Sequence, residues 1–268
     1  MDPASDFLSG RSAIVTGGST GLGRAFAKAL VDAGADVTLC DIRQDAPQVA
    51  GALTGKGRAQ GLVADVSRLP DIERLVNAAV DAYGGVDLLI NNAALWAETP
   101  VTDPYEKAVS DWDRIMGTNL LGVLLCSRAC VPLMIERGGG DIVNISTYYV
   151  LPARHGSTNP PGTDLYNASK WALNGFTQAW ALALAGHRIR VNALAMGPTD
   201  TEMLRGLFDG DPPADFAATW MKPEQIANQL LDLLHEGRQG RSGENIGAWM
   251  GMPVELGPRK APHRAITG

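Results

Sequence analysis

The sequence predicts an α/β fold: a single domain built on a doubly wound, seven-stranded parallel sheet flanked by helices in three αβα layers. Short apolar, β-branched runs alternate along the chain with longer helical patterns, as expected for a parallel sheet covered on both faces. The runs are continuous rather than alternating, as in Ser-Ala-Ile-Val-Thr at 12–16, which indicates strands buried on both sides. The 268 residues suit one domain, and no Pro/Gly-rich linker divides them.

The expected elements follow one another in alternation. Strands are expected at 11–16, 35–41, 59–63, 86–90, 141–146, 188–193 and 245–250. Helices are expected at 21–33, 69–83, 104–136, 164–185 and 223–235. Right-handed crossovers between these elements generate a doubly wound sheet.

Two segments rich in Gly and Pro, 147–163 and 197–222, follow the carboxyl ends of predicted strands. Ligands bind on that side of such sheets, and we expect 197–222 to be a substrate loop. The core is expected to span 8–251, with a C-terminal tail at 252–268 that either reaches a neighbouring subunit or is disordered.

Composition excludes several classes of partner. The net charge is −6 and the basic residues do not cluster, so nucleic acid and anionic membrane surfaces are not expected partners. Unbroken apolar stretches fall far short of the ~20 residues of a membrane helix. The start, Met-Asp-Pro-Ala-Ser-Asp, lacks the features of a signal peptide, so a cytoplasmic protein is expected.

Cysteine and histidine give no sign of a metal site. Cys40, Cys126 and Cys130 have neither disulfide nor zinc spacing, and the last two, four residues apart in an apolar helical run, are interpreted as core residues. The four histidines are widely scattered, so no metal is expected.

A glycine-rich loop connects the first predicted strand to the first predicted helix. Gly17, Gly21 and Gly23 in Thr-Gly-Gly-Ser-Thr-Gly-Leu-Gly permit a tight turn and a close backbone approach to a pyrophosphate. The helix that follows presents free N–H groups and a partial positive charge. The alternative is an ordinary strand–helix turn.

An acidic residue, Asp41, ends the second predicted strand. A carboxylate there can accept hydrogen bonds from both adenosine ribose hydroxyls, and it would repel a 2′-phosphate. Neither Thr20 nor Ile42 is basic, although Arg43 lies nearby. NAD is therefore preferred over NADP. The alternative interpretation of Asp41 is a solvated residue in a turn.

Tyr166 and Lys170 are four residues apart in a predicted helix. Such positions share one helical face, with Cβ atoms about 5–6 Å apart. A neighbouring positive charge is expected to lower the tyrosine pKa from its ordinary value of about 10. A phenol with a lowered pKa can exchange a proton with an alcohol or a carbonyl oxygen. The alternative is a surface lysine beside a half-buried tyrosine.

With these motifs in this order, residues 8–251 resemble the compact branch of the short-chain dehydrogenase/reductase (SDR) family, which has a Rossmann-type fold. The matching segments are Thr16 with Gly17-x-x-x-Gly21-x-Gly23, Asp65-Val66, Asn91-Asn92-Ala93-Ala94, Asn119, Tyr166 with Lys170, and Val191 to Gly197. The resemblance implies cofactor contacts from Gly17, Ser19, Thr20, Gly21, Leu22, Gly23, Asp41, Ile42, Asp65, Val66, Asn92, Ala93, Ala94, Tyr166, Lys170, Met196, Gly197, Thr199 and Thr201.

The chain departs from the family pattern at three places. Ala94 and Met196 replace a customary Gly and Pro. The family's catalytic serine aligns with Thr147, although Ser146 is the alternative. Adjacent strand residues point to opposite faces, so only one of these two hydroxyls can face the site, and Thr147 is preferred.

The resemblance also implies a mechanism, with Asn119, Thr147, Tyr166 and Lys170 as catalytic residues. Tyr166 exchanges the proton, Lys170 lowers its pKa and binds the nicotinamide ribose, Thr147 holds the substrate oxygen, and Asn119 holds a relay water. The expected activity is NAD-dependent alcohol dehydrogenase and ketone reductase.

Candidate pocket residues follow the predicted strands at the ligand edge. They are Trp96, Tyr148, Tyr149, Leu204 and Phe208, together with Leu151, Met196, Met203, Leu207 and Trp220. As a set they favour a hydrophobic, cyclic or aromatic secondary alcohol or ketone, although each alone is more often a packing residue. Arg154, His155 and Arg205 could instead recognise an anion, and the loop around 154–157 is expected to cap the pocket.

The sequence also allows other interpretations of assembly and function. The helices around 118–135 and 171–185 are expected to form a homodimer and then a homotetramer, as is usual in the family, or simply to cover the sheet. A dinucleotide-binding sensor or scaffold with little turnover is the main alternative function. A sugar epimerase or dehydratase is a second one, but such chains have a different glycine spacing and a larger substrate domain.

Overall fold

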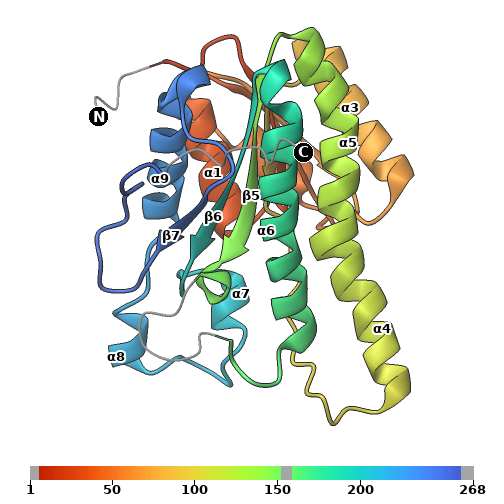
Figure 1. Ribbon diagram of the computed structural model, residues 1–268, viewed down its shortest axis with the longest axis vertical. Helices are drawn as coiled ribbons and strands as arrows, with labels where there is room; N and C mark the ends of the chain where they lie inside the picture. Colours follow the sequence, from red (N-terminus) through yellow and green to blue (C-terminus); the bar gives the residue numbers. More distant parts are fainter. Residues whose placement is uncertain (1–5, 152–158, 261–268) are drawn as a thin grey trace, which may run out of the picture.

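The computed structural model describes residues 6–151 and 159–260, which form one α/β domain (Figure 1). Its strands are β1 (Ser12–Thr16), β2 (Asp36–Asp41), β3 (Ala59–Val63), β4 (Leu88–Asn91), β5 (Gly140–Thr147), β6 (Ile189–Met196) and β7 (Asn245–Ala248). They make one seven-stranded sheet in the order β3-β2-β1-β4-β5-β6-β7, and every pair is parallel. The doubly wound fold expected from the sequence is confirmed.

The helices cover both faces of this sheet. They are α1 (Gly21–Asp32), α2 (Ala46–Gly51), α3 (Leu69–Tyr83), α4 (Tyr105–Met116), α5 (Gly122–Glu136), α6 (Asp164–Leu184), α7 (Glu202–Arg205), α8 (Ala214–Ala217) and α9 (Pro223–His235). α1 packs beside α9 on one face, and α3, α5 and α6 cover the other (Figure 1). All residues of β1, β5 and β6 are buried between these layers, as expected for central strands that are covered on both faces.

Each face has its own apolar core. Phe26 and Leu30 of α1 pack with Leu230 of α9 on one side of the sheet. The other core contains Cys126 and Cys130, which are free and fully or almost fully buried, as the sequence indicated. The strand order reverses between β1 and β4, so the chain leaves these two strands in opposite directions and opens a crevice at their carboxyl ends.

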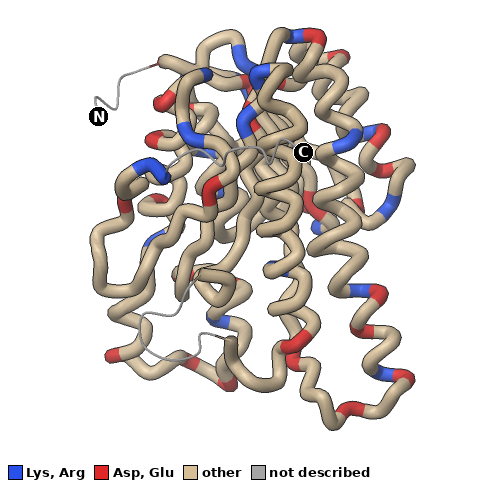
Figure 2. Tube along the Cα trace, viewed as in Figure 1, with Lys and Arg blue, Asp and Glu red and all other residues tan. Residues whose placement is uncertain are grey.

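The structure differs from the predicted elements in its details. The expected helix 104–136 is α4 and α5 joined by a π-helical turn, η1 (Gly117–Leu121). The short helices α2, α7 and α8 were not expected from the sequence, and α7 and α8 lie within the predicted substrate loop. Acidic and basic residues are interspersed along the chain trace (Figure 2).

Candidate active site

A cavity of about 640 Å³ lies at the carboxyl ends of the strands, which is a size typical of cofactor and substrate sites. Residues that follow β1, β2, β4, β5 and β6 line it, as do residues of α6 and α7. Of the residues expected to contact the cofactor, all but Ser19 line this cavity. The topology therefore gathers into one place motifs that are far apart in the sequence.

The glycine loop is packed so tightly that side chains cannot replace two of its glycines. Gly17 has φ +64°, and a Cβ there would lie 2.9 Å from Ala93 Cα. A Cβ on Gly23 would overlap the Gly17 carbonyl oxygen. Asn92 Nδ2 donates to the carbonyl oxygens of Thr16 (2.9 Å) and Gly17 (3.0 Å), which fastens the loop to the end of β4. The first turn of α1 is thereby held at the cavity wall.

Asp41 is held in place by backbone N–H groups on both sides. The Ser19 N–H donates to Asp41 Oδ2 (3.0 Å), and the Arg43 N–H donates to Oδ1 (3.2 Å). Ser19 is buried, so it supports Asp41 through its backbone instead of lining the cavity. The Arg43 guanidinium forms an ion pair with Asp45 at 2.7 Å.

Thr147, Tyr166 and Lys170 meet at the cavity wall where β5 ends beside α6. The Thr147 and Tyr166 side chains share a hydrogen bond. Lys170 Nζ donates to the Ile145 carbonyl oxygen (2.7 Å) and lies 5.8 Å from the centroid of the Tyr166 ring. The end of β5 supplies a hydroxyl, and the spacing along α6 places a phenol and an ammonium beside it.

The electrostatics of this group differ from the sequence-based expectation. Desolvation raises the pKa of Tyr166 to about 12, and the hydrogen bond with Thr147 opposes that rise. Burial also lowers the pKa of Lys170 to about 8. The pKa of Tyr166 is therefore raised in the protein alone, and not lowered as expected, because desolvation outweighs the effects that favour the phenolate. Helical spacing predicted that the two groups would be close, but it gave no information on how deeply they are buried.

Asn119 lies behind the cavity wall, 1% exposed, in the π-helical turn η1. The Leu95 N–H donates to Asn119 Oδ1 (2.7 Å), and Asn119 Nδ2 donates to the Leu95 carbonyl oxygen (2.9 Å). Nδ2 also donates to Ser169 Oγ (3.1 Å), whose hydroxyl donates to the Tyr166 carbonyl oxygen (2.7 Å). These contacts connect the loop after β4 to the helix that carries Tyr166 and Lys170, so Asn119 positions the site from outside the cavity lining.

Ser146 and Thr147 both border the cavity, but their hydroxyls are in different surroundings. Thr147 bonds to Tyr166, whereas the buried Ser146 Oγ has no hydrogen-bond partner among the described residues. The geometry thus pairs Thr147, and not Ser146, with the phenol.

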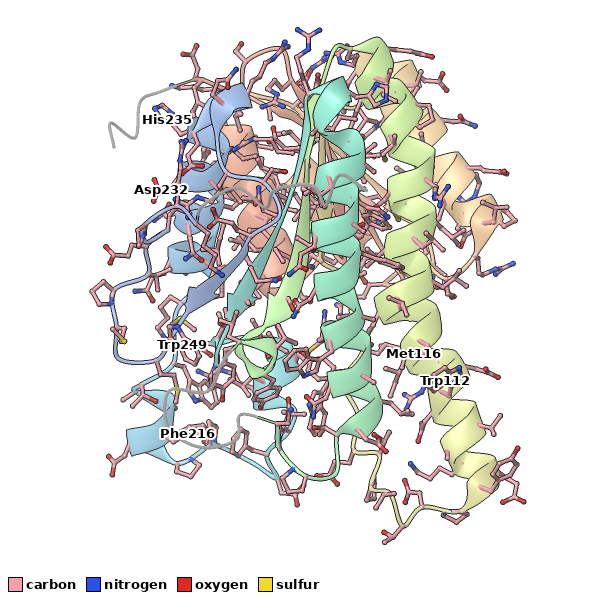
Figure 3. The ribbon with its side chains drawn as sticks, viewed as in Figure 1. Trp112, Met116, Phe216, Asp232, His235 and Trp249 are labelled. Carbon is pink, nitrogen blue, oxygen red and sulfur yellow. The ribbon has the colours of Figure 1, made fainter. Side chains whose placement is uncertain are left out.

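One part of the cavity lining is aromatic and apolar. Trp96, Tyr148, Tyr149, Met196, Met203, Leu204 and Leu207 line it. The Tyr148 ring lies 4.7 Å from that of Tyr149 and 5.6 Å from that of Trp249, centroid to centroid. Trp249 and Phe216 lie at the end of the molecule where these strands finish (Figure 3).

Three of the proposed pocket residues, Leu151, Phe208 and Trp220, are not in the cavity lining. The Phe208 ring packs against Trp220 at 5.8 Å and so belongs to the inside of the 197–222 segment. Arg205, one of the candidate anion-binding residues, forms an ion pair with Asp200 at 2.6 Å and is not in the lining either. The other two candidates for anion recognition, Arg154 and His155, are outside the described residues.

Several cavity residues were missed by the sequence analysis. They are Ala64, Ser67, Leu95, Asp113, Arg114, Thr118, Ile145, Pro198 and Glu202. Most of them neighbour a motif residue without belonging to the motif. Glu202 directly follows the expected contact Thr201, and that proximity was the one signal available for it.

Comparisons with known proteins agree with this geometry. The sequence profile described as short chain dehydrogenase matches residues 11–212. The chain is 32% identical over 262 residues to the short chain dehydrogenase/reductase astE of Aspergillus oryzae, across 92% of this chain and 96% of that protein. It is 30% identical over 253 residues to the 3-oxoacyl-(acyl-carrier-protein) reductase FabG of Thermotoga maritima, across 92% and 99%.

A solved structure is also similar. The 3-ketoacyl-(acyl-carrier-protein) reductase of Brucella melitensis, crystallised with NADH, matches with a TM-score of 0.78 and 27% identity, covering 91% of this chain and 98% of that one. The chain therefore belongs to the short-chain dehydrogenase/reductase family and is an oxidoreductase of that family.

Proposed function

We propose that this protein is an NAD-dependent oxidoreductase that interconverts a secondary alcohol and a ketone, with a hydrophobic, cyclic or aromatic substrate. One observation carries the proposal: Thr147, Tyr166 and Lys170 converge in the cavity that also contains the glycine loop and Asp41. A proton carrier and a dinucleotide site in one cavity are the two parts that hydride transfer requires.

The residues present fit a nicotinamide dinucleotide. Gly17 and Gly23 have no room for a Cβ atom, so the backbone at the start of α1 carries no side chain at these positions. Pyrophosphates bind to exposed backbone N–H groups at such helix starts. NADH in the Brucella melitensis reductase, a structural relative, supports the same class of cofactor here. Asp41 favours NAD, because its carboxylate can accept hydrogen bonds from the ribose hydroxyls and repels a 2′-phosphate. The neighbouring Arg43 guanidinium is paired with Asp45, so it is engaged by another carboxylate.

The chemistry follows from the positions of the side chains. When bound, the nicotinamide supplies or accepts the hydride. In the reduction of a ketone, the Tyr166 phenol gives its proton to the carbonyl oxygen as the carbonyl becomes an alcohol, and in oxidation it takes that proton back. The Thr147 hydroxyl donates to the same oxygen and stabilises its developing negative charge. The nearby Lys170 ammonium favours the phenolate formed in reduction.

The substrate class is inferred from the lining. Trp96, Tyr149, Leu204 and Leu207 offer flat and aliphatic surfaces for a ring. A second candidate is reduction of 3-oxoacyl thioesters, because the FabG relative is a 3-oxoacyl-(acyl-carrier-protein) reductase.

A substrate panel followed by NADH absorbance tests the proposal. The panel contains cyclic and aromatic secondary alcohols with their ketones, polyols, and a 3-oxoacyl thioester. We expect turnover of the cyclic or aromatic pairs with NAD. Turnover of polyols or thioesters alone would contradict the substrate class, and binding of dinucleotide without any turnover would favour a sensor or scaffold.

We further propose that the chain assembles as a homodimer or homotetramer through α4, α5 and α6. Large apolar side chains are exposed on this layer: Tyr105, Val109, Trp112, Leu121, Trp171 and Leu182. Trp112 and Met116 lie on α4, which projects beyond the sheet (Figure 3). Among the described residues, the stretch Tyr105–Glu136 is also the one helix long and apolar enough to cross a membrane, with 39% of its window buried. An exposed apolar face of this kind is typical of a subunit contact.

Light scattering on a sizing column tests the assembly. Trp112→Glu places a charge on the exposed face of α4 and should shift the protein towards the monomer. Leu69→Glu, equally exposed at 52% but on α3, is the matched control and should leave the mass unchanged. A monomeric unmodified protein would contradict the proposal.

A further inference from the structure

Glu202 places a carboxylate beside the glycine loop. It is the first residue of α7, and the preceding residue, Thr201, caps that helix by accepting a hydrogen bond from the Leu204 N–H at 3.3 Å. A Cβ built on Gly21 would lie 3.0 Å from Thr201 Cγ2 and 3.4 Å from Glu202 Oε2. Glu202 therefore lies next to the first residue of α1, on the cavity wall that the 197–222 segment provides.

Asp41 lines the same cavity and accepts a hydrogen bond from the Ser19 N–H of the glycine loop at 3.0 Å. Arg43, which follows Asp41 closely, has its pKa raised mainly by its hydrogen bond and ion pair with Asp45, and also by the charges of Asp41 and Glu202. The side chain of Glu202 thus lies within electrostatic range of the segment that binds the adenosine ribose. The carboxylates of Asp41 and Glu202 border the same stretch of the cleft.

Apart from Arg43, which forms an ion pair with Asp45, positive charge is sparse around this stretch. The basic residues in the described cavity lining are Arg114 and Lys170. Arg114 forms an ion pair with Asp111 at 2.8 Å, and Lys170 belongs to the catalytic group. A dinucleotide phosphate near Gly21 therefore meets the N–H groups of α1 on one side and a carboxylate on the other.

We propose that Glu202 is a second acidic determinant of cofactor choice, which acts with Asp41 to exclude NADP(H). The inference rests on the proposed function to the extent that a dinucleotide occupies this cavity. The Glu202 carboxylate opposes the pyrophosphate of either cofactor, but NADP(H) carries an additional phosphate and is opposed more strongly. Replacing Asp41 alone then leaves one acidic wall of the cleft in place.

The test measures dissociation constants for NADH and for NADPH by nucleotide fluorescence, with the full-length protein. The variants are Glu202→Gln, Asp41→Asn and the double variant, and Glu224→Gln on the exposed first turn of α9 is the charge-matched control. We expect Glu202→Gln to tighten NADPH about 3- to 10-fold and NADH by a smaller factor. The double variant should bind NADPH more tightly than Asp41→Asn does, and the gain should shrink at high salt.

The outcomes separate this inference from the proposed function. An unchanged NADPH dissociation constant in Glu202→Gln, or a change no larger than that in Glu224→Gln, overturns the role of Glu202 while the NAD-dependent activity stands. If the unmodified protein prefers NADPH, the proposed NAD preference fails, and so does the exclusion of NADP(H) by Asp41 and Glu202. If the unmodified protein binds neither dinucleotide, both proposals fall.

Discussion

Replacing Thr147 with Val keeps the shape of the side chain and removes its hydroxyl. That hydroxyl bonds to Tyr166 and faces the cavity where the substrate oxygen is expected. Removing one preorganised donor from a developing oxyanion costs about 10²–10³ in kcat, or about 2.7–4 kcal/mol. We therefore expect Thr147→Val to lower kcat by at least ~100-fold, while Thr147→Ser, which keeps the hydroxyl, retains most of the rate.

Ser146→Ala is the matched comparison one residue earlier. Ser146 is 3% exposed and its Oγ has no hydrogen-bond partner among the described residues. An unsatisfied buried hydroxyl carries a desolvation penalty of about 1–3 kcal/mol, so its removal should not lower the melting temperature. The rate should stay within about twofold of the unmodified protein, because this hydroxyl is not paired with the phenol.

The assay is NADH absorbance with the best substrate from the panel, with kcat and KM determined separately and melting temperatures recorded for all three variants. The melting temperatures distinguish lost catalysis from lost folding. The assignment fails if Ser146→Ala loses as much rate as Thr147→Val, or if Thr147→Val keeps a third or more of its turnover.

Three further predictions follow from the same geometry. Gly23→Ala should weaken NADH binding at least ~10-fold in a fluorescence titration, because its Cβ would overlap the Gly17 carbonyl oxygen and displace the loop; unchanged affinity would contradict this packing argument. The kcat/KM of ketone reduction should fall as pH rises through about 8, where Lys170 loses its charge while Tyr166, with a pKa of about 12, keeps its proton. Lys170→Arg should remove that inflection, and an inflection that persists would assign it to another group. Asp200→Asn removes the ion pairs with Arg205 (2.6 Å) and Lys222 (2.8 Å), which connect parts of the 197–222 segment. The KM for substrate should therefore rise about threefold or more, with kcat less affected. A lower kcat at constant KM would contradict this.

The fold could be predicted from the sequence because its strands are short, apolar and buried on both sides. The runs 12–16 and 88–91 each contain three consecutive apolar residues, and the structure buries every residue of both. The short helices escaped prediction for a physical reason. α7 and α8 have four residues each, which is too short for a helical period to appear in the sequence.

The π-helical turn shows a different limit. An apolar pattern continues through 104–136, so the sequence indicated one helix, although η1 adds an extra residue to one turn. Asn119 lies in this turn and bonds both Leu95 and Ser169. Hydrophobic periodicity reports which face is buried, and not the local hydrogen-bond pattern.

Site residues could be predicted from the sequence where they belong to motifs with a fixed spacing. They could not be predicted where only the tertiary fold places them at the cavity. The pair Tyr166 and Lys170 could be found by helical spacing, and the glycine loop by its position between a strand and a helix. Leu95, in the loop after β4, and Glu202, at the start of α7, reach the cavity along paths that depend on tertiary packing. The pKa directions depend on desolvation, which spacing cannot report.

The turnover of Tyr166→Phe, measured beside its NADH dissociation constant, tests most directly whether this phenol is the proton carrier. The substitution removes one hydroxyl and leaves the glycine loop and Asp41 untouched. We expect NADH affinity close to that of the unmodified protein and a loss of rate of at least ~100-fold, the low end for general acid–base catalysis. A variant that binds NADH and keeps most of its turnover would show that the proton travels by another group.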